Sequence, residues 1–422
     1  MLTINEQRFL RDLHQLASIG LLPESDGGGR DRRAFSAAER EARRFFASIA
    51  RAAGLPIRTD QAGNVSARLP AAQPDAPTLL FGSHFDTVPN GGPYDGALGV
   101  MAGLEALRVL QEAGEPLPVT LECIAFTDEE GRYCGLTGSQ LAAGTYSREA
   151  TQRFYDAAVQ YPADVEAMGE FLPSAFTVDD LLRARRDDED LFGFVELHIE
   201  QGPQLEHEGK TIGVVDAIFG RVSYQVVFTG RADHAGTTPM RLRADALSAA
   251  AAFITYMIGF VRDVCPGAVL TCGDVLVQPG ADNVVPREAR VLVEFRANSP
   301  HTLDKIDAEM HASLAKLGQR PGIGATARGG HRLDPRPMHP SIRRDIEASC
   351  AALGYSSMTL SSGALHDAHS MAAIVPAGMI FVPSIDGRSH CPEEDTAEPD
   401  LVAGANVLLQ TIIRLAQNGI EP

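Results

Sequence analysis

The chain has 422 residues, of which 44% are hydrophobic and 22% are charged, so it can bury a large core and is expected to form two domains. Its formal net charge of -18 argues against sequence-independent binding of nucleic acid, because contacts to phosphates need clustered lysine and arginine. The six cysteines form no Cys-x-x-Cys pair and the N-terminal residues lack a secretion-signal pattern, so we expect a cytoplasmic protein with reduced thiols.

The first half of the chain has the alternating pattern of an α/β fold. Helical periodicity over residues 5–52 is broken at three glycines and resumes after Ser36, a predicted N-cap. Strand and helix patterns then alternate, which predicts a sheet with helices on its faces. The predicted strands are 79–84, 119–126 and 194–198, and the predicted helices are 96–113 and 138–144. Residues 146–190 form a polar connector with few helix signals, to which we assign no fold.

The pattern changes between residues 213 and 330. Predicted strands and helices follow the order βαββαβ of a small ferredoxin-like domain. Its apolar helix, 246–261, is shorter than the roughly 20 residues that cross a bilayer, so we expect a packed helix and no membrane partner. A final sheet strand is predicted at 377–383. The sequence therefore predicts a discontinuous catalytic domain, 1–212 with 331–422, and an inserted domain, 213–330.

Five imidazole or carboxylate side chains stand where apolar strands give way to turns or where a helix begins. They are His84, Asp95, Glu130, His198 and His390. The carboxyl ends of strands are where α/β sheets place their sites, and imidazole with carboxylate suits Zn, Mn, Co or Ni better than Mg or Ca. We predict that Asp95 bridges two divalent cations about 3.5–4 Å apart.

The adjacent carboxylates Glu129 and Glu130 are predicted to have different roles. On an extended segment, adjacent side chains point to opposite sides, so the two carboxylates cannot bind one metal in the same way. We assign Glu130 to metal and Glu129 to general base and then acid, because a free carboxylate beside a metal-bound water can accept its proton. Asp86 is predicted to accept the second imidazole N–H of His84 and so fix its tautomer.

Each of these elements has a simpler explanation when taken alone, since a lone His-x-Asp or Glu-Glu pair is more often solvated or part of a satisfied core. Their combination, in this order and at strand ends, favours a metal site. A covalent mechanism is not favoured, because the chain has no Gly-x-Ser-x-Gly turn and Cys391 simply follows the predicted ligand His390.

Several longer strings, among them Gly82–Gly92, Tyr94–Val100, Phe126–Gly131, Glu196–Pro203 and Asp233–Met240, resemble the hydantoinase/carbamoylase amidases of the M20 metallopeptidase-like superfamily. The resemblance implies a mixed sheet flanked by helices, an inserted lid and dimerisation domain, two metal ions per subunit and a homodimer. It also implies a substrate-binding set: Gln201, His234, Asn283, Arg296, His366 and Gly387.

The implied roles agree with the chemistry of these side chains. Arg296 can hold a carboxylate through two parallel N–H bonds, and His234 can donate to the oxygen that becomes negative during attack. Asn283 and Gln201 offer the donor and acceptor that a ureido group needs. Without the resemblance, Arg296 would equally be an ordinary surface ion-pair partner.

Two positions depart from the family pattern. Leu365 and Asp386 stand where glycine is common, so the first narrows the expected pocket and the second adds negative charge. We expect hydrolysis of an N-carbamoyl-L-amino acid to the amino acid, CO2 and ammonia. The alternatives are allantoate amidohydrolase, β-ureidopropionase and, more remotely, an M20 aminoacylase or dipeptidase. A non-catalytic binding protein is disfavoured by the free base Glu129.

Overall fold

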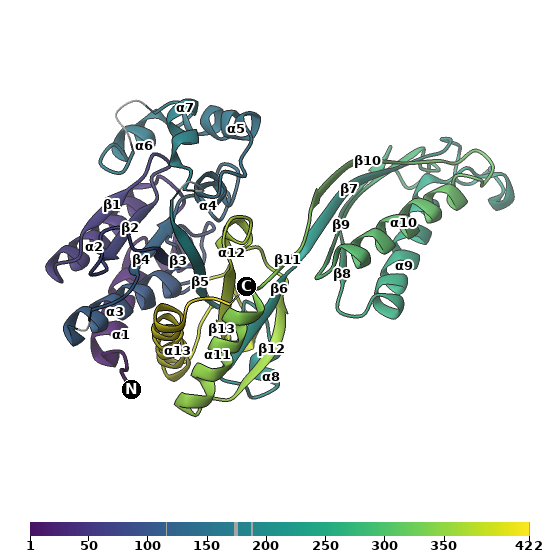
Figure 1. Cartoon of the computed structure of the whole chain (residues 1–422). Helices are drawn as coiled ribbons and strands as arrows, with labels where there is room; N and C mark the ends of the chain where they lie inside the picture. Colours follow the sequence, from purple (N-terminus) through teal and green to yellow (C-terminus); the bar gives the residue numbers. More distant parts are fainter. Residues whose placement is uncertain (115, 173–175, 187–188, 422) are drawn as a thin grey trace. The chain divides into compact units, whose positions relative to one another are not determined.

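The computed structural model describes residues 1–114, 116–172, 176–186 and 189–421 (Figure 1). They divide into two compact units, one formed by Met1–Asp216 with Met338–Pro422 and the other by Ala217–Pro337. Each unit has its own cluster of buried apolar side chains, so each can be described as a separate packed body.

The first unit is built on a mixed sheet of strand order β1-β2-β4-β3-β5-β13-β6, with β12 also paired to β6. The strands β3, β4, β5 and β13 run parallel, whereas β1, β2 and β6 are antiparallel to their neighbours. The strands are β1 (Ile57–Thr59), β2 (Val65–Leu69), β3 (Thr78–His84), β4 (Thr120–Phe126), β5 (Leu191–Ile199), β6 (Ile212–Ile218), β12 (Ser357–Ser362) and β13 (Ala377–Val382), and β11 (Arg336–Pro337) pairs with the end of β6.

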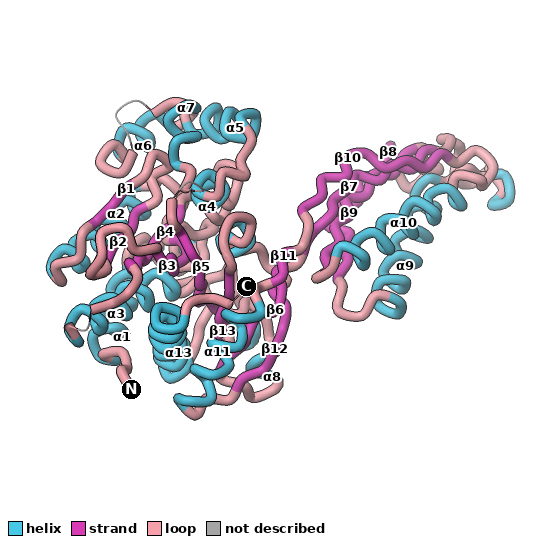
Figure 2. Tube along the Cα trace, in the orientation of Figure 1, coloured by secondary structure: helices cyan, strands magenta, loops and turns pink. Residues whose placement is uncertain are grey.

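Helices flank this sheet, as predicted (Figure 2). Helix α3 is buried along nearly its whole length and packs on β3, β4 and β5, with α13 beside it. Ser36 caps α2 as expected, since its hydroxyl accepts the N–H of Glu39 at 3.1 Å. The helices are α1 (Glu6–Ser18), η1 (Glu24–Asp26), α2 (Ala37–Ala52), α3 (Ala97–Ala113), α4 (Thr137–Ala142), α8 (Gln204–His207), α11 (Pro340–Leu353), α12 (Asp367–Met371), η4 (Ile385–Gly387) and α13 (Glu398–Asn418).

The expectation of a helix-poor connector over 146–190 is wrong. Its described residues include α5 (Arg148–Ala158), α6 (Pro162–Ala167), α7 (Val178–Leu181) and η2 (Leu182–Ala184), joined by turns; residues 173–175 and 187–188 lie outside the described residues. The helices are short, so periodicity gives little signal. They pack around an aromatic cluster in which the ring centroid of Phe154 lies 6.0 Å from that of Phe35 and 6.4 Å from that of Phe176.

The second unit has the predicted βαββαβ order. Its antiparallel sheet runs β10-β7-β9-β8, and alternate residues of β9, from Ala289 to Phe295, are buried against the helices. Its elements are β7 (Gly220–Thr229), η3 (Met240–Leu242), α9 (Ala246–Val264), β8 (Val269–Gln278), β9 (Glu288–Ala297), α10 (Pro300–Leu317) and β10 (Gly324–Leu333). The expectation that this apolar helix is too short to cross a bilayer is wrong, because α9 runs for 19 residues. Among the described helices, it alone is long and apolar enough to cross a membrane by length and composition. One face of it, including Phe253 and Met257, packs in the core of the unit, as predicted.

Candidate metal and amidohydrolase site

The predicted ligands meet at one edge of the first unit's sheet. His84 ends β3, Glu130 lies in the turn after β4, His198 is near the end of β5, and His390 follows β13. These four strands are parallel, and the register pairs His84 with Phe126 and His198 with Phe381. Carboxyl ends of parallel strands meet at the same edge, so residues up to three hundred positions apart in the sequence are brought together there.

Asp95, in the turn before α3, lies between two groups of ligands. Its Oδ1 is 3.4 Å from His84 Nε2 and 3.2 Å from His198 Nε2. Its Oδ2 is 3.4 Å from His390 Nε2, which is also 3.4 Å from Glu130 Oε2. The carboxylate of Asp95 therefore faces both groups, which is the arrangement that a bridging ligand requires.

The imidazole tautomers show that these residues fit metal ions. Main-chain carbonyls of Asp86 and Ile199 lie 2.9 and 2.8 Å from Nδ1 of His84 and His198, so each Nδ1 carries the proton. Each Nε2 then faces a carboxylate oxygen, and two lone pairs at this distance repel unless a proton or a metal cation lies between them. Burial alone lowers the pKa of His84, but Glu129, Asp95 and Asp86 raise it well above its ordinary value. The surrounding carboxylates therefore stabilise positive charge at this position.

Glu129, the predicted general base, lies beside the first group. Its Oε2 lies 3.6 Å from His84 Nε2, and burial raises its pKa well above the ordinary value. Burial and Asp95 raise the pKa of Glu130 to about 8. The two carboxylates do face different histidines, but the predicted extended segment is wrong: Asp128, with φ of 54°, opens a turn. Its own carboxylate accepts the N–H of Tyr133 at 3.1 Å, which closes that turn.

The structure gives Asp86 a different role from the expected one. The carbonyl oxygen of Asp86, not its carboxylate, lies within hydrogen-bond distance of His84, and the carboxylate is 3.6 Å from Nδ1. The carboxylate instead accepts the N–H groups of Glu129 at 3.3 Å and Glu130 at 3.1 Å. Asp86 therefore holds the glutamate turn against the end of β3.

Three predicted substrate-binding residues lie in the first unit. Gln201 donates its side-chain N–H to Asp95 Oδ2 at 2.7 Å, and its Oε1 is buried without a partner. His366 is only 2% exposed, bonds Ser362 through Nε2 and meets the ring of His198 edge-on, with the two ring centroids 4.4 Å apart. It therefore supports a ligand rather than presenting a surface. Gly387 has φ of 64°, and a Cβ there would lie 2.7 Å from the main-chain nitrogen of Pro203.

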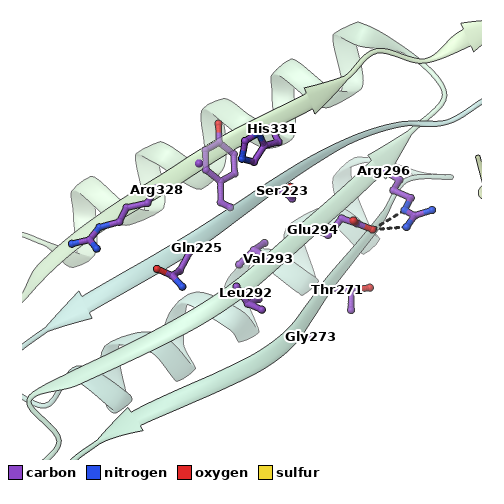
Figure 3. A pocket seen from close by; sticks show the side chains of 12 residues that line it. Ser223, Gln225, Thr271, Gly273, Leu292, Val293, Glu294, Arg296, Arg328 and His331 are labelled. Atoms are coloured by element: carbon purple, nitrogen blue, oxygen red, sulfur yellow. Dashed lines mark hydrogen bonds and ion pairs between the residues drawn. The ribbon is translucent and has the colours of Figure 1, made fainter. Parts of the chain in front are cut away.

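The other three substrate-binding candidates lie in the second unit. His234 Nδ1 accepts the N–H of Gly236 at 3.0 Å, which leaves Nε2–H free to donate to a substrate oxygen. The N–H of Ala235 bonds the carbonyl of Asn283 at 2.9 Å, so the loops carrying His234 and Asn283 are joined. Arg296 lies on the sheet face away from the helices and pairs with Glu294 at 2.7 Å (Figure 3).

Within the second unit, Arg296 and the His234–Asn283 pair are at opposite ends of the sheet. Arg296 pairs with Arg221 at the start of β7, whereas Ala289 pairs with Phe228 near its end. Asn283 lies beyond that end, joined to the chain that follows β7. Seven residue steps at about 3.4 Å give a separation of about 24 Å along the strand. One small substrate cannot contact both from one copy of this unit.

Comparison with known proteins agrees with this site. Residues 80–414, which include all five predicted ligands, match the model of peptidase family M20/M25/M40. The chain belongs to this family. It is 36% identical to N-carbamoyl-L-amino acid amidohydrolase of Geobacillus stearothermophilus over 98% of this chain and 99% of that protein. It is 34% identical to allantoate amidohydrolase of Bacillus subtilis, over 86% and 87% respectively.

The structural comparison points the same way. A hydantoinase/carbamoylase family amidase from Burkholderia multivorans superposes with a TM-score of 0.88 at 31% identity, over 98% of both chains. The predicted resemblance to these amidases is confirmed. The M20 member described here is therefore a hydrolase, with candidate metal-binding groups of the kind that a metal-dependent enzyme requires.

Proposed function

We propose that the protein is a metal-dependent amidohydrolase that cleaves the ureido C–N bond of an N-carbamoyl-L-amino acid. The observation that carries the proposal is the convergence of three histidines and the carboxylate of Glu130 around Asp95, with Glu129 beside them. The names of its relatives support the substrate class. In this proposal His84, Asp95 and His198 hold one divalent ion, and Asp95, Glu130 and His390 hold a second, each being Zn, Mn, Co or Ni.

The chain's own residues account for the proton transfers. Bound divalent cations would lower the pKa of water and polarise the ureido carbonyl. Glu129 accepts a proton from the attacking water and returns it to the departing nitrogen. His234 donates its Nε2–H to the developing oxyanion, and Arg296 holds the substrate carboxylate. The carbamate left by this cleavage then breaks down to CO2 and the second amine, so the products are the amino acid, CO2 and ammonia.

We also propose a homodimer in which the second unit joins two copies. If His234, Asn283 and Arg296 all contact one substrate, they come from two copies, because about 24 Å separates them along one sheet. The edge strand β8 and helix α9 expose apolar side chains, including Leu276 at 57% and Tyr256 at 47%. An exposed apolar edge strand is suited to pairing with a second copy. The first unit is then the catalytic domain and the second the dimerisation domain.

Other substrates of the same class remain candidates. Allantoate and N-carbamoyl-β-alanine present the same ureido group, and half-buried Leu365 with exposed Asp386 would favour a small or amine-bearing substrate. A dipeptidase or aminoacylase would use the same metal ligands. The amide of Gln201 beside Asp95 favours a ureido substrate, because its buried Oε1 has no partner and can accept an N–H of the ureido group.

The test is ammonia release by protein loaded separately with Mn²⁺ or Zn²⁺. The substrates are N-carbamoyl-L-amino acids, allantoate and N-carbamoyl-β-alanine, with Glu129→Gln as the control. Turnover of one ureido acid, reduced about 10²–10⁴-fold in Glu129→Gln at unchanged metal content, is the expected result. Hydrolysis of dipeptides or N-acetyl amino acids without any ureido acid would contradict the proposal.

A further inference from the structure

A buried carboxylate that belongs to neither ligand group lies directly behind the candidate metal site. Glu394 is four residues after His390 and 3% exposed. Its Oε1 accepts the main-chain N–H of Tyr94 at 2.9 Å and of Asp95 at 3.1 Å. Its Oε2 accepts the hydroxyl of Ser389 at 2.7 Å. One side chain thus joins the turn that carries Asp95 to the loop that carries His390.

Ser389 contacts only one of the two ligand groups, the one formed by Asp95, Glu130 and His390. Its hydroxyl lies 2.9 Å from Asp95 Oδ2, the oxygen that faces His390. The other oxygen, Oδ1, faces His84 and His198. Glu394 therefore fixes the main chain of Asp95 and holds Ser389 in contact with the carboxylate oxygen of the second group; the single hydroxyl hydrogen of Ser389 bonds Glu394 Oε2 or Asp95 Oδ2, not both at once. The first group receives its support elsewhere, from main-chain carbonyls at Nδ1 of its histidines.

The packing around Glu394 leaves it little freedom to move. A Cβ at position 92 would lie 2.0 Å from Glu394 Cδ, so the chain at Gly92 passes in contact with the carboxylate, which only glycine permits. Residues 92–95 form no helix or strand. The main-chain N–H groups of Tyr94 and Asp95 are satisfied by Glu394 and not by secondary structure. Without this carboxylate, two buried N–H groups would lose their acceptor.

We propose that Glu394 is a positioning residue for the second metal ion, the one assigned to Asp95, Glu130 and His390. The inference rests on the proposed function, because it takes those residues as ligands. Glu394 acts through hydrogen bonds and not through its charge, and it contacts neither the metal nor the substrate. Partners of this kind typically change metal affinity by 10–100-fold when removed.

The variants separate hydrogen bonding from charge and from general stability. Glu394→Ala removes all three hydrogen bonds. Glu394→Gln keeps an oxygen for the two N–H groups, and its amide donates to Ser389, whose proton then goes to Asp95. Asp60→Ala is the matched control: Asp60 is also buried and accepts two main-chain N–H bonds and one side-chain N–H, from Ala62 and Asn64, with no described contact to the predicted ligands.

The experiment is titration of the metal-free full chain with Co²⁺ alone, followed by visible absorption and calorimetry. In Glu394→Ala the second equivalent should bind about 10–100-fold more weakly and the first within about threefold of the parent, while Glu394→Gln and Asp60→Ala keep both. Equal weakening of both equivalents, no weakening, or a Glu394→Gln variant as impaired as Glu394→Ala would overturn the proposal.

Two further measurements keep the test decisive. If Glu394→Ala does not fold, Ser389→Ala removes the same link to Asp95 and should weaken the second equivalent selectively; equal effects on both equivalents would refute the role. Failure of the proposed function is distinguishable, since a parent chain that binds fewer than two Co²⁺ lacks the dimetal site itself. A parent that binds two but releases no ammonia from ureido acids refutes the substrate class and leaves the role of Glu394 intact.

Discussion

Mixed dimers test whether His234 serves the active site of the other subunit. Consider a heterodimer of a Glu129→Gln chain with a His234→Ala chain, isolated through two different affinity tags. If His234 acts across the interface, one site lacks both residues and the other is complete. The heterodimer should then have about half the parent kcat per dimer. Each homodimer should stay near background, since loss of the base costs about 10²–10⁴-fold and loss of an oxyanion donor about 10²–10³-fold.

The control pairs Glu129→Gln with Arg296→Ala. The separation of about 24 Å along β9 requires that Arg296 and His234 reach one substrate from different copies. Arg296 is then supplied by the subunit that supplies Glu129, and this heterodimer has no complete site. The assay is ammonia release at saturating substrate, with dimer content checked by light scattering. Background activity in both heterodimers, or recovery in both, would refute the reasoning.

Three other perturbations have defined outcomes. Removal of metal by a chelator should abolish ammonia release and lower the Tm, and Mn²⁺ or Zn²⁺ at 100 times Kd should restore about 2.7 kcal/mol per site; a Tm insensitive to metal would contradict this. Gly96→Ala should lower kcat/KM about 100-fold, because the added Cβ would lie 2.4 Å from His84 Cε1. The control is Gly114→Ala at the other end of α3: Gly114 also has a positive φ, but a Cβ there would meet nothing within 4 Å, so this variant should keep its activity. Arg186→Met should destabilise the protein to urea by about 3–5 kcal/mol at pH 7, because it leaves the buried carboxylate of Glu122 with only the hydroxyl of Ser66 at 2.6 Å and the guanidinium of Arg68 at 3.4 Å. In the parent, burial raises the pKa of Glu122, but Arg186, Ser66 and Arg68 together lower it below its ordinary value. Without Arg186 the pKa of Glu122 should rise, so the loss of stability should shrink as the pH falls below about 5; a loss independent of pH would show that Glu122 is not responsible.

Local patterns in the sequence were sufficient to predict the fold class and the residues that the structure brings together around Asp95. Long apolar runs that end in His84, Phe126 and His198 specify buried strands, because burial on both faces leaves no place for alternation. The short helices of the 146–190 connector gave no such signal, since four to eleven residues define no period and their aromatic contacts come from distant segments such as Phe35.

What the sequence by itself determined is therefore the set of elements and the residue types at their ends, which depend on neighbours within a few positions. Only the tertiary structure decided how those ends are used. In it, the carboxylate of Asp86 accepts the N–H of Glu129, and the buried ring of His366 packs edge-on against His198. Glu394 accepts the N–H of Asp95, which lies 299 positions away in the sequence. These roles depend on which strands are neighbours and on which donor lies nearest in space. That information is absent from any local window of the chain.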